Sequence, residues 1–212
     1  MSLTFKQVVD EVLADSFAEA KRSSAKSWVQ ARHALLWDHA DWTFKYGTDT
    51  ITVTAGSAAV GSVAADLGSV IALYNSDGEQ LRAIRDHREF YESYNANLSD
   101  TGEPEAFTVI GGQVIVGPVS SVTRSDWLMV YKKRKPTLSA DGDATGIPDG
   151  YDVALIHGGK AEGYKLSNIP LWQAFDQNYL YYIKVMEGQY LNELDGAQDT
   201  FGGAYRPDVR SY

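Results

Sequence analysis

The sequence contains no cysteine at all, and this absence excludes several kinds of chemistry at once. The 212-residue chain can form no disulfide bond, no zinc–thiolate site and no cysteine nucleophile. Such a composition fits a protein made and assembled in a reducing cytoplasm. A chain of this length can bury enough apolar surface to fold without covalent or metal cross-links, so we expect an ordinary hydrophobic core.

Long apolar runs and positive charge are also scarce. No stretch approaches the ~20 apolar residues that cross a bilayer, so we expect no membrane association. Residues 1–5 lack the basic and apolar regions of a secretory signal, and we expect none. The net charge of −9 argues against general affinity for nucleic acid, which needs clustered lysine and arginine. An acidic surface could nevertheless let DNA pass without adhering.

Motifs of catalysis are missing as well. The four histidines form no HExxH pair, no GxSxG elbow is present, and the Gly-Gly-Lys of residues 158–160 lacks the upstream glycine of a phosphate-binding loop. We therefore expect no enzymatic activity and no cofactor. One alternative stays open, a small hydrolase that uses His87 or His157. A deep pocket holding either histidine beside a carboxylate would favour that alternative.

The segment that begins at Asp141 resembles the start of a calcium-binding loop. Asp141, Asp143 and Thr145 occupy alternate positions, as the first ligands of an EF-hand do. However, the twelfth position is Asp152 rather than a bidentate glutamate, and a predicted strand precedes the segment instead of a helix. We interpret the segment as a polar turn that leads into a helix, and we keep these three residues as a weak candidate metal site.

Helical periodicity appears at the start of the chain. Phe5, Val9, Val12 and Leu13 recur at helical spacing. The polar residues 22–24 are expected to end this helix, and the last of them, a serine, is a candidate N-cap for the next one. One side of that second helix is predicted to carry Trp28, Ala31, Leu35, His39 and Trp42. Two helices joined by a short polar connection usually pack as an antiparallel hairpin.

From residue 46 to about residue 135 the period changes to that of strands. Residues 50–54 alternate, two predicted hairpins join 70–74 to 80–84 and 107–110 to 113–116, and 127–131 form a further strand. Asp86 and Glu89 resemble a capping box that opens a short helix. The basic residues 132–135 are interpreted as a solvated strand end that protects a sheet edge, with a contact to phosphate or an acidic neighbour as the alternative.

Two further helices are predicted near the end of the chain, one from about Tyr151 and one with Pro170 at its first position. The predicted fold class is α+β: a helical bundle formed from the N- and C-terminal helices, with an inserted small antiparallel β module and an extended C-terminal tail. The expected boundaries are 1–45 for the N-terminal helical hairpin, 46–136 for the β module, 137–194 for the C-terminal helices and 195–212 for the tail.

Aromatic residues exceed what one buried stripe can hold, since the chain has 13 tyrosines. Tyr and Trp favour interfaces because they bury a large area and keep a polar group. We therefore expect a subunit interface with the candidates Trp28, Trp172, Tyr179, Tyr181 and Tyr182. An alternative is a carbohydrate- or protein-binding β module, which would need the strand aromatics Tyr74, Phe107 and Trp127 to be exposed.

Residues 195–212 are rich in glycine and polar residues and contain too little apolar surface to order by themselves. Anchors for an extended segment laid on a partner are nevertheless present. These anchors are Phe201, Tyr205, Arg206, Pro207 and Tyr212.

Spaced motifs along most of the chain resemble those of the head-to-tail adaptor proteins of tailed bacteriophages. Residues 28–44 read Trp-Val-x-Ala-Arg-x3-Leu-x-Asp-x3-Trp-x-Phe, and residues 71–78 carry Ile-Ala-Leu-Tyr followed by Asp-Gly. Residues 111–118 contain Gly-Gly-Gln and Val-Gly-Pro, and residues 140–156 contain Ala-Asp-x-Asp followed by Ile-Pro-x2-Tyr-x3-Leu-Ile. The resemblance covers about residues 28–190.

The resemblance implies a structural subunit of the virion neck, assembled in the host cytoplasm. Such adaptors form a homo-oligomeric ring, usually of twelve copies, beneath the portal protein, and they join the DNA-filled capsid to a tail or nozzle protein. DNA passes through the channel without sequence-specific binding. On this view, helical faces contact neighbouring copies, the C-terminal segment from Phe201 to Tyr212 grips the portal, and the β module faces the tail components.

Overall fold

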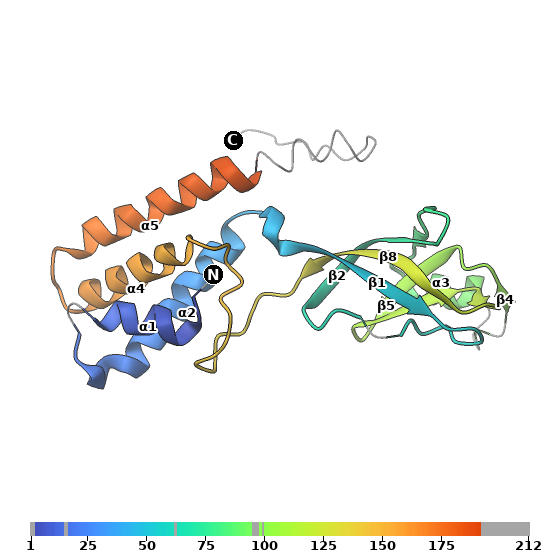
Figure 1. Cartoon of the computed structure of the whole chain (residues 1–212), viewed down its shortest axis with the longest axis horizontal. Coiled ribbons are helices and arrows are strands. Elements are labelled where there is room, and N and C mark those ends of the chain that lie inside the picture. The colour runs from blue at the N-terminus through green and yellow to red at the C-terminus, as the bar shows by residue number, and fades with distance from the viewer. Residues whose placement is uncertain (1–2, 15–16, 62, 95–97, 99, 192–212) are drawn as a thin grey trace. The chain divides into compact units, whose positions relative to one another are not determined.

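The computed structural model describes residues 3–14, 17–61, 63–94, 98 and 100–191. The chain forms two compact units: a helical unit, Met1–Phe44 with Pro136–Tyr212, and a β unit, Lys45–Lys135. Helices from both parts of the chain thus share one unit, and the strands form the other (Figure 1). This arrangement confirms the predicted α+β class. The predicted extended tail, residues 195–212, lies outside the described residues.

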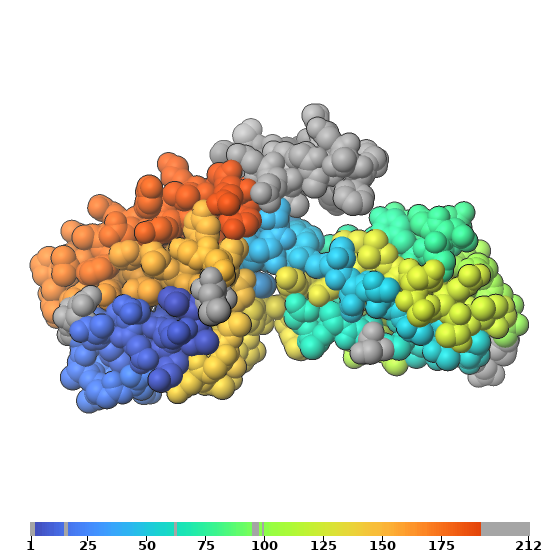
Figure 2. Space-filling view, viewed as in Figure 1, coloured from blue at the N-terminus to red at the C-terminus, as the bar shows by residue number. Residues whose placement is uncertain are grey.

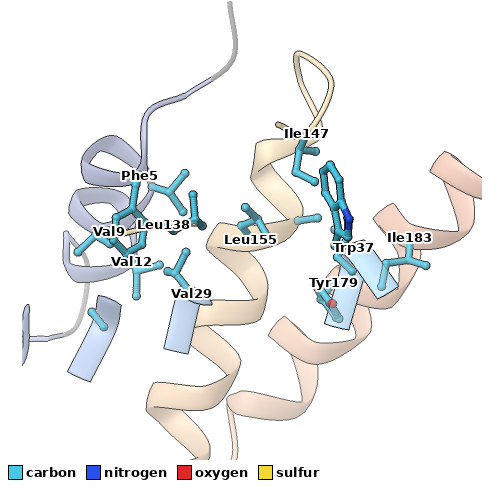
Figure 3. Close-up of a cluster of buried hydrophobic side chains, with 14 of the residues drawn as sticks. Phe5, Val9, Val12, Val29, Trp37, Leu138, Ile147, Leu155, Tyr179 and Ile183 are labelled. Carbon is cyan, nitrogen blue, oxygen red and sulfur yellow. The ribbon is translucent and has the colours of Figure 1, made fainter. Parts of the chain in front are cut away.

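The described part of the helical unit contains four α-helices: α1 (Phe5–Leu13), α2 (Arg22–His39), α4 (Asp152–Leu166) and α5 (Trp172–Met186). The short helices η1 (Glu19–Lys21), η2 (Thr43–Lys45) and η3 (Glu187–Leu191) flank them. Helix α4 packs against α1, α2 and α5, and side chains from these helices and from the loop before α4 form the core (Figure 3). No helix in the described ranges combines the length and apolarity that a membrane crossing requires.

Helix α1 follows its sequence signals closely. The Thr4 hydroxyl accepts a hydrogen bond from the Gln7 N–H, and the Gln7 side chain accepts one from the Thr4 N–H, which completes a capping box. The predicted residues Phe5, Val9 and Val12 are fully buried. Because both the cap and the apolar stripe are local features, this helix could be predicted from nearby residues alone.

Helix α2 differs from the prediction in its start and in its buried face. It begins at Arg22 and continues through the predicted break, and its buried side includes Val29 and Leu36. Leu35, expected on the buried side, is 59% exposed. Trp42 is buried, but it lies beyond the helix and its indole N–H donates to the Leu36 carbonyl at 2.8 Å. Two sets of residues in α2 have helical spacing, and the set that contacts α4 is the one that is buried in the core.

The β unit contains two three-stranded sheets and a short strand pair. The first sheet has the order β1 (Tyr46–Val53), β8 (Arg124–Lys133), β2 (Leu67–Tyr74), and all its pairings are antiparallel. The second has the order β3 (Arg82–Ala83), β5 (Ala106–Ile110), β6 (Gln113–Gly117). Strands β4 (Thr101–Gly102) and β7 (Val119–Ser120) pair with each other, and helix α3 (His87–Ser93) follows β3. The predicted short helix is confirmed, with the Asp86 side chain as its cap.

One predicted hairpin is confirmed in full, and the other is confirmed only next to its turn. Strands β5 and β6 pair in register around Gly111 and Gly112, which have φ of 60° and 81° as a tight hairpin turn requires. Gly78 likewise forms a turn with φ of 80°, and the chain folds back there through the antiparallel bridge from Tyr74 to Gln80 and the hydrogen bond from the Leu81 N–H to the Leu73 carbonyl at 2.8 Å. Farther from the turn the two segments separate: β2 pairs with β8, and β3 pairs in parallel with β5. The non-local partners place β2 beside the strand that carries the buried Trp127.

Candidate functional site

The five aromatic interface candidates occupy different environments in the helical unit. Tyr179 is only 3% exposed, and its hydroxyl donates to the Arg32 carbonyl at 3.1 Å. Burial raises the pKa of Tyr179 to about 12. Trp28, Trp172 and Tyr182 are half-buried, and Tyr181 is 63% exposed. The structure therefore gives Tyr179 a packing role inside the unit and leaves Tyr181 as the most accessible of the candidates.

The half-buried candidates contact other residues of the same unit. Trp28 meets the Phe17 ring edge-on, with the ring centroids 5.3 Å apart. Tyr182 stacks on His157 with a centroid separation of 5.7 Å, and the Lys165 ammonium lies 5.6 Å from the Trp172 ring. Part of each side chain thus stabilises the unit itself, and only the remainder is available to a neighbour.

Six exposed large hydrophobic residues lie on α5 and near its start, and we call them the α5 surface. They come from α5, from the connection between α4 and α5 and from the last residue of α4, and each is at least 37% exposed. They are Leu166, Ile169, Leu171, Leu180, Tyr181 and Val185. Figure 2 shows α5, in orange to red, at the surface of the helical unit. Exposed apolar groups gathered on one element are typical of a contact surface.

The aromatic pattern alone does not identify the aliphatic members of the α5 surface. Tyr181 and Val185 lie on the side of α5 away from the buried Tyr179 and Ile183, and Leu180 lies between the two sides. The sequence of α5 does contain a signal for an exposed apolar surface, because large apolar residues occur outside the single stripe that an amphipathic helix buries. A helix that is apolar on both sides needs a second partner in addition to its own core.

A buried charge cluster fixes α5 to its neighbours. Arg32 of α2 is 8% exposed, and its guanidinium lies 2.8 Å from Glu162 of α4 and 2.8 Å from Asp176 of α5. The same guanidinium lies 4.8 Å from the centre of the Tyr179 ring. Because a buried charge is costly without partners, these contacts specify how the three helices meet. No local sequence pattern indicates that an arginine occupies this buried position.

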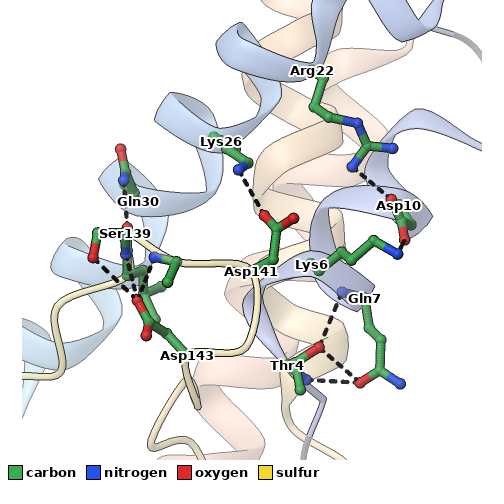
Figure 4. Close-up of polar contacts among 12 residues, drawn as sticks. Thr4, Lys6, Gln7, Asp10, Arg22, Lys26, Gln30, Ser139, Asp141 and Asp143 are labelled. Atoms are coloured by element: carbon green, nitrogen blue, oxygen red, sulfur yellow. Dashed lines mark hydrogen bonds and ion pairs between the residues drawn. The ribbon is translucent and has the colours of Figure 1, made fainter.

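The Asp141 segment holds the start of α1. The carbonyls of Asp143 and Asp141 accept the N–H groups of Phe5 and Lys6, at 2.8 and 3.0 Å. These groups belong to the first turn of α1, where no partner within the helix exists. Lys26 donates to the Asp141 carboxylate at 2.7 Å, and this contact lowers the pKa of Asp141 (Figure 4). The segment thus connects α1, α2 and the loop before α4.

The weak candidate metal ligands are already engaged by the protein. The Asp143 carboxylate accepts from the Ser139 and Ala140 N–H groups at 2.6 and 2.7 Å, which lowers its pKa. Thr145 donates its hydroxyl to the buried Asp152 at 2.5 Å. Among the described residues, no group of three or more His, Cys, Asp or Glu side chains is arranged to hold a metal ion. This geometry is that of a structural turn.

The histidines of the hydrolase alternative lie in unsuitable surroundings. His157 packs between the rings of Phe175 and Tyr182, and burial together with the charge of Lys160 lowers its pKa. His87 lies at a groove in the β unit, with Nε2 3.1 Å from the Val109 carbonyl oxygen. No Asp or Glu belongs to the described lining of that groove. Among the described residues, neither histidine therefore contacts the carboxylate that would favour this alternative.

The strand aromatics do not form an exposed binding surface. Trp127 is fully buried, and Phe107 is 3% exposed. Both side chains belong to the core of the β unit, and Tyr74 is half-buried. A carbohydrate-binding surface built on these rings would need them to be accessible for stacking. The condition stated for the alternative of a binding module is therefore not met by Phe107 or Trp127.

The basic cluster of residues 132–135 does not protect a sheet edge, and that interpretation is wrong. Strand β8 is the central strand of its sheet, between β1 and β2. Lys132 lies 5.8 Å from the Tyr46 ring, and the Arg134 side chain donates to the Ala65 carbonyl at 3.1 Å. The cluster thus terminates a paired strand and contacts adjacent backbone and aromatic groups.

The predicted anchors Phe201, Tyr205, Arg206, Pro207 and Tyr212 lie outside the described residues. A comparison with curated proteins finds no match. A comparison with protein families finds one that fits almost the whole sequence, the SU10 adaptor protein, with residues 3–210 matched. The match includes the helical unit, the β unit and most of the C-terminal segment. The resemblance to phage adaptors is thereby confirmed, and the chain belongs to the family of phage SU10 adaptor proteins.

Proposed function

We propose that this chain forms a ring beneath the portal of a bacteriophage and joins the DNA-filled capsid to the tail. Its family makes it a phage adaptor and hence a structural part of the virion. The finer proposal specifies a ring of about twelve copies, as the resemblance implies, with the portal on one side and a tail or nozzle protein on the other. We place assembly in the host cytoplasm, in keeping with a chain that has no cysteine.

The α5 surface is the observation that supports ring formation. In a ring of identical subunits each contact is heterologous, so every copy must present two different complementary surfaces. The α5 surface supplies one apolar surface, with Leu180 and Tyr181 54% and 63% exposed. Leu35 on α2 is the other strongly exposed large hydrophobic residue of the described helical unit. We propose that the α5 surface of one copy packs against the α2 surface around Leu35 of the next.

Two further parts of the proposal concern the channel and the C-terminal segment. A net charge of −9 suits a channel through which DNA moves without adhesion, because like charges repel at short range. The anchors from Phe201 to Tyr212 are proposed to bind the portal. We propose no catalytic activity and no cofactor, since the adaptor role requires only binding.

Negative-stain electron microscopy of the purified chain mixed with its portal tests the proposal. We expect an additional ring of density on the portal with the unaltered chain. The double substitution Leu180→Glu and Tyr181→Glu introduces charge into the α5 surface and should prevent ring closure, because unpaired charges in an apolar contact are costly. Val122→Glu, at a 52% exposed position of the β unit, is the matched control and should leave the ring intact.

One further measurement and two contradicting outcomes complete the test. Far-UV circular dichroism should show unchanged helix content in all variants, since the substituted residues are exposed. Rings that form equally well with the double substitution would eliminate the α5 surface as the subunit contact. An unaltered chain that adds no density to the portal would contradict the proposed function as a whole.

A further inference from the structure

A groove of about 470 Å³ lies in the β unit, between β2 and β5. Ser69, Val70 and Ile71 of β2 form one wall. Thr108 and Val109 of β5 form the opposite wall, and Arg85 and His87 lie where the chain leaves β3 and enters α3. All described lining residues belong to the β unit, so the groove is independent of the α5 surface.

The β2 wall of the groove carries an open strand edge. In the described sheet β8 is the only strand that forms a ladder with β2, and at the other edge the backbone contacts reach only Leu73 and Tyr74, through the hydrogen bond from the Leu81 N–H and the bridge to Gln80. The pairing with β8 shifts register between Leu67 and Ser69 and again between Val70 and Ala72. Backbone N–H and C=O groups on an open edge form hydrogen bonds with an added extended segment. The geometry of this wall therefore matches a polypeptide in β conformation.

The opposite wall contains a buried polar group. Thr108 is 2% exposed, and its hydroxyl oxygen is buried without a hydrogen-bond partner. Because this oxygen is itself covered, the polar contacts that the groove offers to a ligand come from the β2 edge and from Arg85. Beside it, Val109 and the 45% exposed Ile71 offer contacts to aliphatic side chains.

The charge of the groove is positive. Arg85 is exposed, His87 is exposed beside it, and the described lining contains no carboxylate. In a chain with a net charge of −9, a cationic site without acidic neighbours in its lining is a local exception. It favours a ligand that carries an Asp or Glu side chain, because arginine pairs with carboxylates through two parallel hydrogen bonds.

We propose that this groove binds an extended acidic segment of a partner protein, which adds as a strand along the β2 edge and places a carboxylate against Arg85. Residues 68–71 correspond to about 13 Å of edge at about 3.3 Å per residue, enough for about four residues of the segment. A polypeptide is favoured over a carbohydrate because Phe107 is buried and offers no stacking surface. This inference goes beyond ring formation, which the proposed function assigns to the helical unit.

Fluorescence anisotropy with a synthetic peptide tests the inference. The probe is a fluorescein-labelled heptapeptide of sequence TVEVEVT, and the full chain is titrated into it. We expect saturable binding at least tenfold tighter than that of TVKVKVT, since lysines would face Arg85. N-methylation of alternate amides in the acidic peptide should weaken binding at least tenfold, because those amides can no longer donate to the strand edge.

Charge reversal in the protein provides the matched comparison. Arg85→Glu should weaken binding of the acidic peptide at least tenfold and bring the affinity for the lysine peptide above it. Arg124→Glu reverses an exposed arginine that is not in the groove lining and should leave both affinities unchanged. Binding insensitive to both Arg85→Glu and N-methylation would overturn the inference. So would equal affinity for the two peptides, or tighter binding of a single-stranded oligonucleotide.

Peptide binding by the groove can be tested separately from ring formation on the portal. Ring formation on the portal is observed by microscopy and depends on the helical unit, whereas the peptide titration depends on the β unit. A chain that forms rings but does not prefer the acidic peptide would remove the groove assignment alone.

Discussion

At the scale of single residues, side chains that suggest metal binding in the sequence instead connect the first helix to the rest of the helical unit. Asp152 is 2% exposed and accepts hydrogen bonds from the Leu3 N–H at 2.8 Å and from Thr145. Asp141 and Asp143 contact Lys26 and local backbone groups. An acidic loop therefore does not indicate calcium by itself, since its carboxylates can accept from a lysine and from loop N–H groups, and its backbone carbonyls from N–H groups at a helix start.

Asp152 should make the stability of the helical unit depend on pH. Burial raises the pKa of its carboxyl above the ordinary value of 3.8, although the hydrogen bonds from Thr145 and Leu3 oppose this shift. Just above pH 3.8 the folded chain therefore binds more protons at this site than the unfolded chain, and this contribution to stability falls as pH rises. Asp152→Asn removes that titration while keeping a carbonyl acceptor and adding an amide donor.

We therefore expect the stability of Asp152→Asn, relative to the unaltered chain, to improve between pH 4 and pH 7. Urea unfolding followed by circular dichroism at both pH values measures the free energy of unfolding for each protein. Glu11→Gln, at an exposed position of α1, is the control and should show little pH-dependent difference. A difference between Asp152→Asn and the unaltered chain that stays constant, or that changes in the other direction, would disprove this role for Asp152.

At the scale of elements, α4 acts as the central helix because small residues let its neighbours approach. A Cβ added at Gly163 would lie 2.5 Å from the Phe17 ring and 2.6 Å from the Trp28 ring. At Gly159 it would lie 2.8 Å from Val12. Glycine usually lowers helix stability by about 1 kcal/mol relative to alanine, so its presence here indicates that close packing outweighs helix propensity.

Gly163→Ala should therefore destabilise the protein despite the better helix propensity of alanine. We expect a loss of about 1–3 kcal/mol, the usual cost of overpacking a core, because Phe17 and Trp28 must both move. Gly188→Ala is the matched control, since a Cβ there meets nothing within 4 Å. Thermal unfolding should show a lower midpoint for Gly163→Ala only. An equal or higher midpoint would show that the two rings accommodate the methyl group.

Some helices and strands could be predicted from the sequence, and others could not. Helix α1 and the β5–β6 hairpin depend on local chemistry, namely the cap at Thr4 and the turn at Gly111 and Gly112, and both were predicted. The buried face of α2 and the main partner of β2 depend on distant segments, and there the structure differs from the predictions. For α2 the local pattern allows two buried faces, and contact with α4 determines which one is buried. For β2 it allows two strand partners, and most of the strand pairs with β8.

The α5 surface and the β2 groove also depend on contacts between segments that are distant in the sequence. Surplus apolar residues on α5 could be seen in the sequence, but which of them are exposed depends on how α5 packs on α2 and α4. Tyr179 is buried by its contact with Arg32, whereas Tyr181, two residues later, remains exposed. The groove beside β2 could not be predicted, because it requires β2 and β5 to belong to different sheets.

At the scale of the whole molecule, the insertion of one unit into the other allows two kinds of contact to be separated. The helical unit carries the α5 surface, and the β unit carries the β2 groove. Each unit has its own hydrophobic core, so a substitution on the surface of one should not unfold the other. A third contact, the C-terminal segment, is predicted to bind the portal, and it should likewise be separable.

Deletion of residues 195–212 should abolish binding to the portal and leave the helical unit folded. All the described helices lie before this segment, so far-UV circular dichroism should be largely unchanged. The reason for lost binding is the removal of Phe201, Tyr205 and Tyr212, whose rings can bury a large area with few rotatable bonds. Co-sedimentation with purified portal, over a range of chain concentrations, measures the affinity.

A chain in which residues 195–212 are replaced by a Gly/Ser segment of equal length separates anchor chemistry from length, and it should fail to bind as the deletion does. The chain with Leu180→Glu and Tyr181→Glu should behave in the opposite way, because its C-terminal anchors are intact: it should still sediment with the portal but form no closed ring. Unchanged affinity of the truncated chain would refute the role of the C-terminal segment. If both variants lost portal binding alike, binding would require ring closure, and the α5 surface and the C-terminal anchors would act as one cooperative contact.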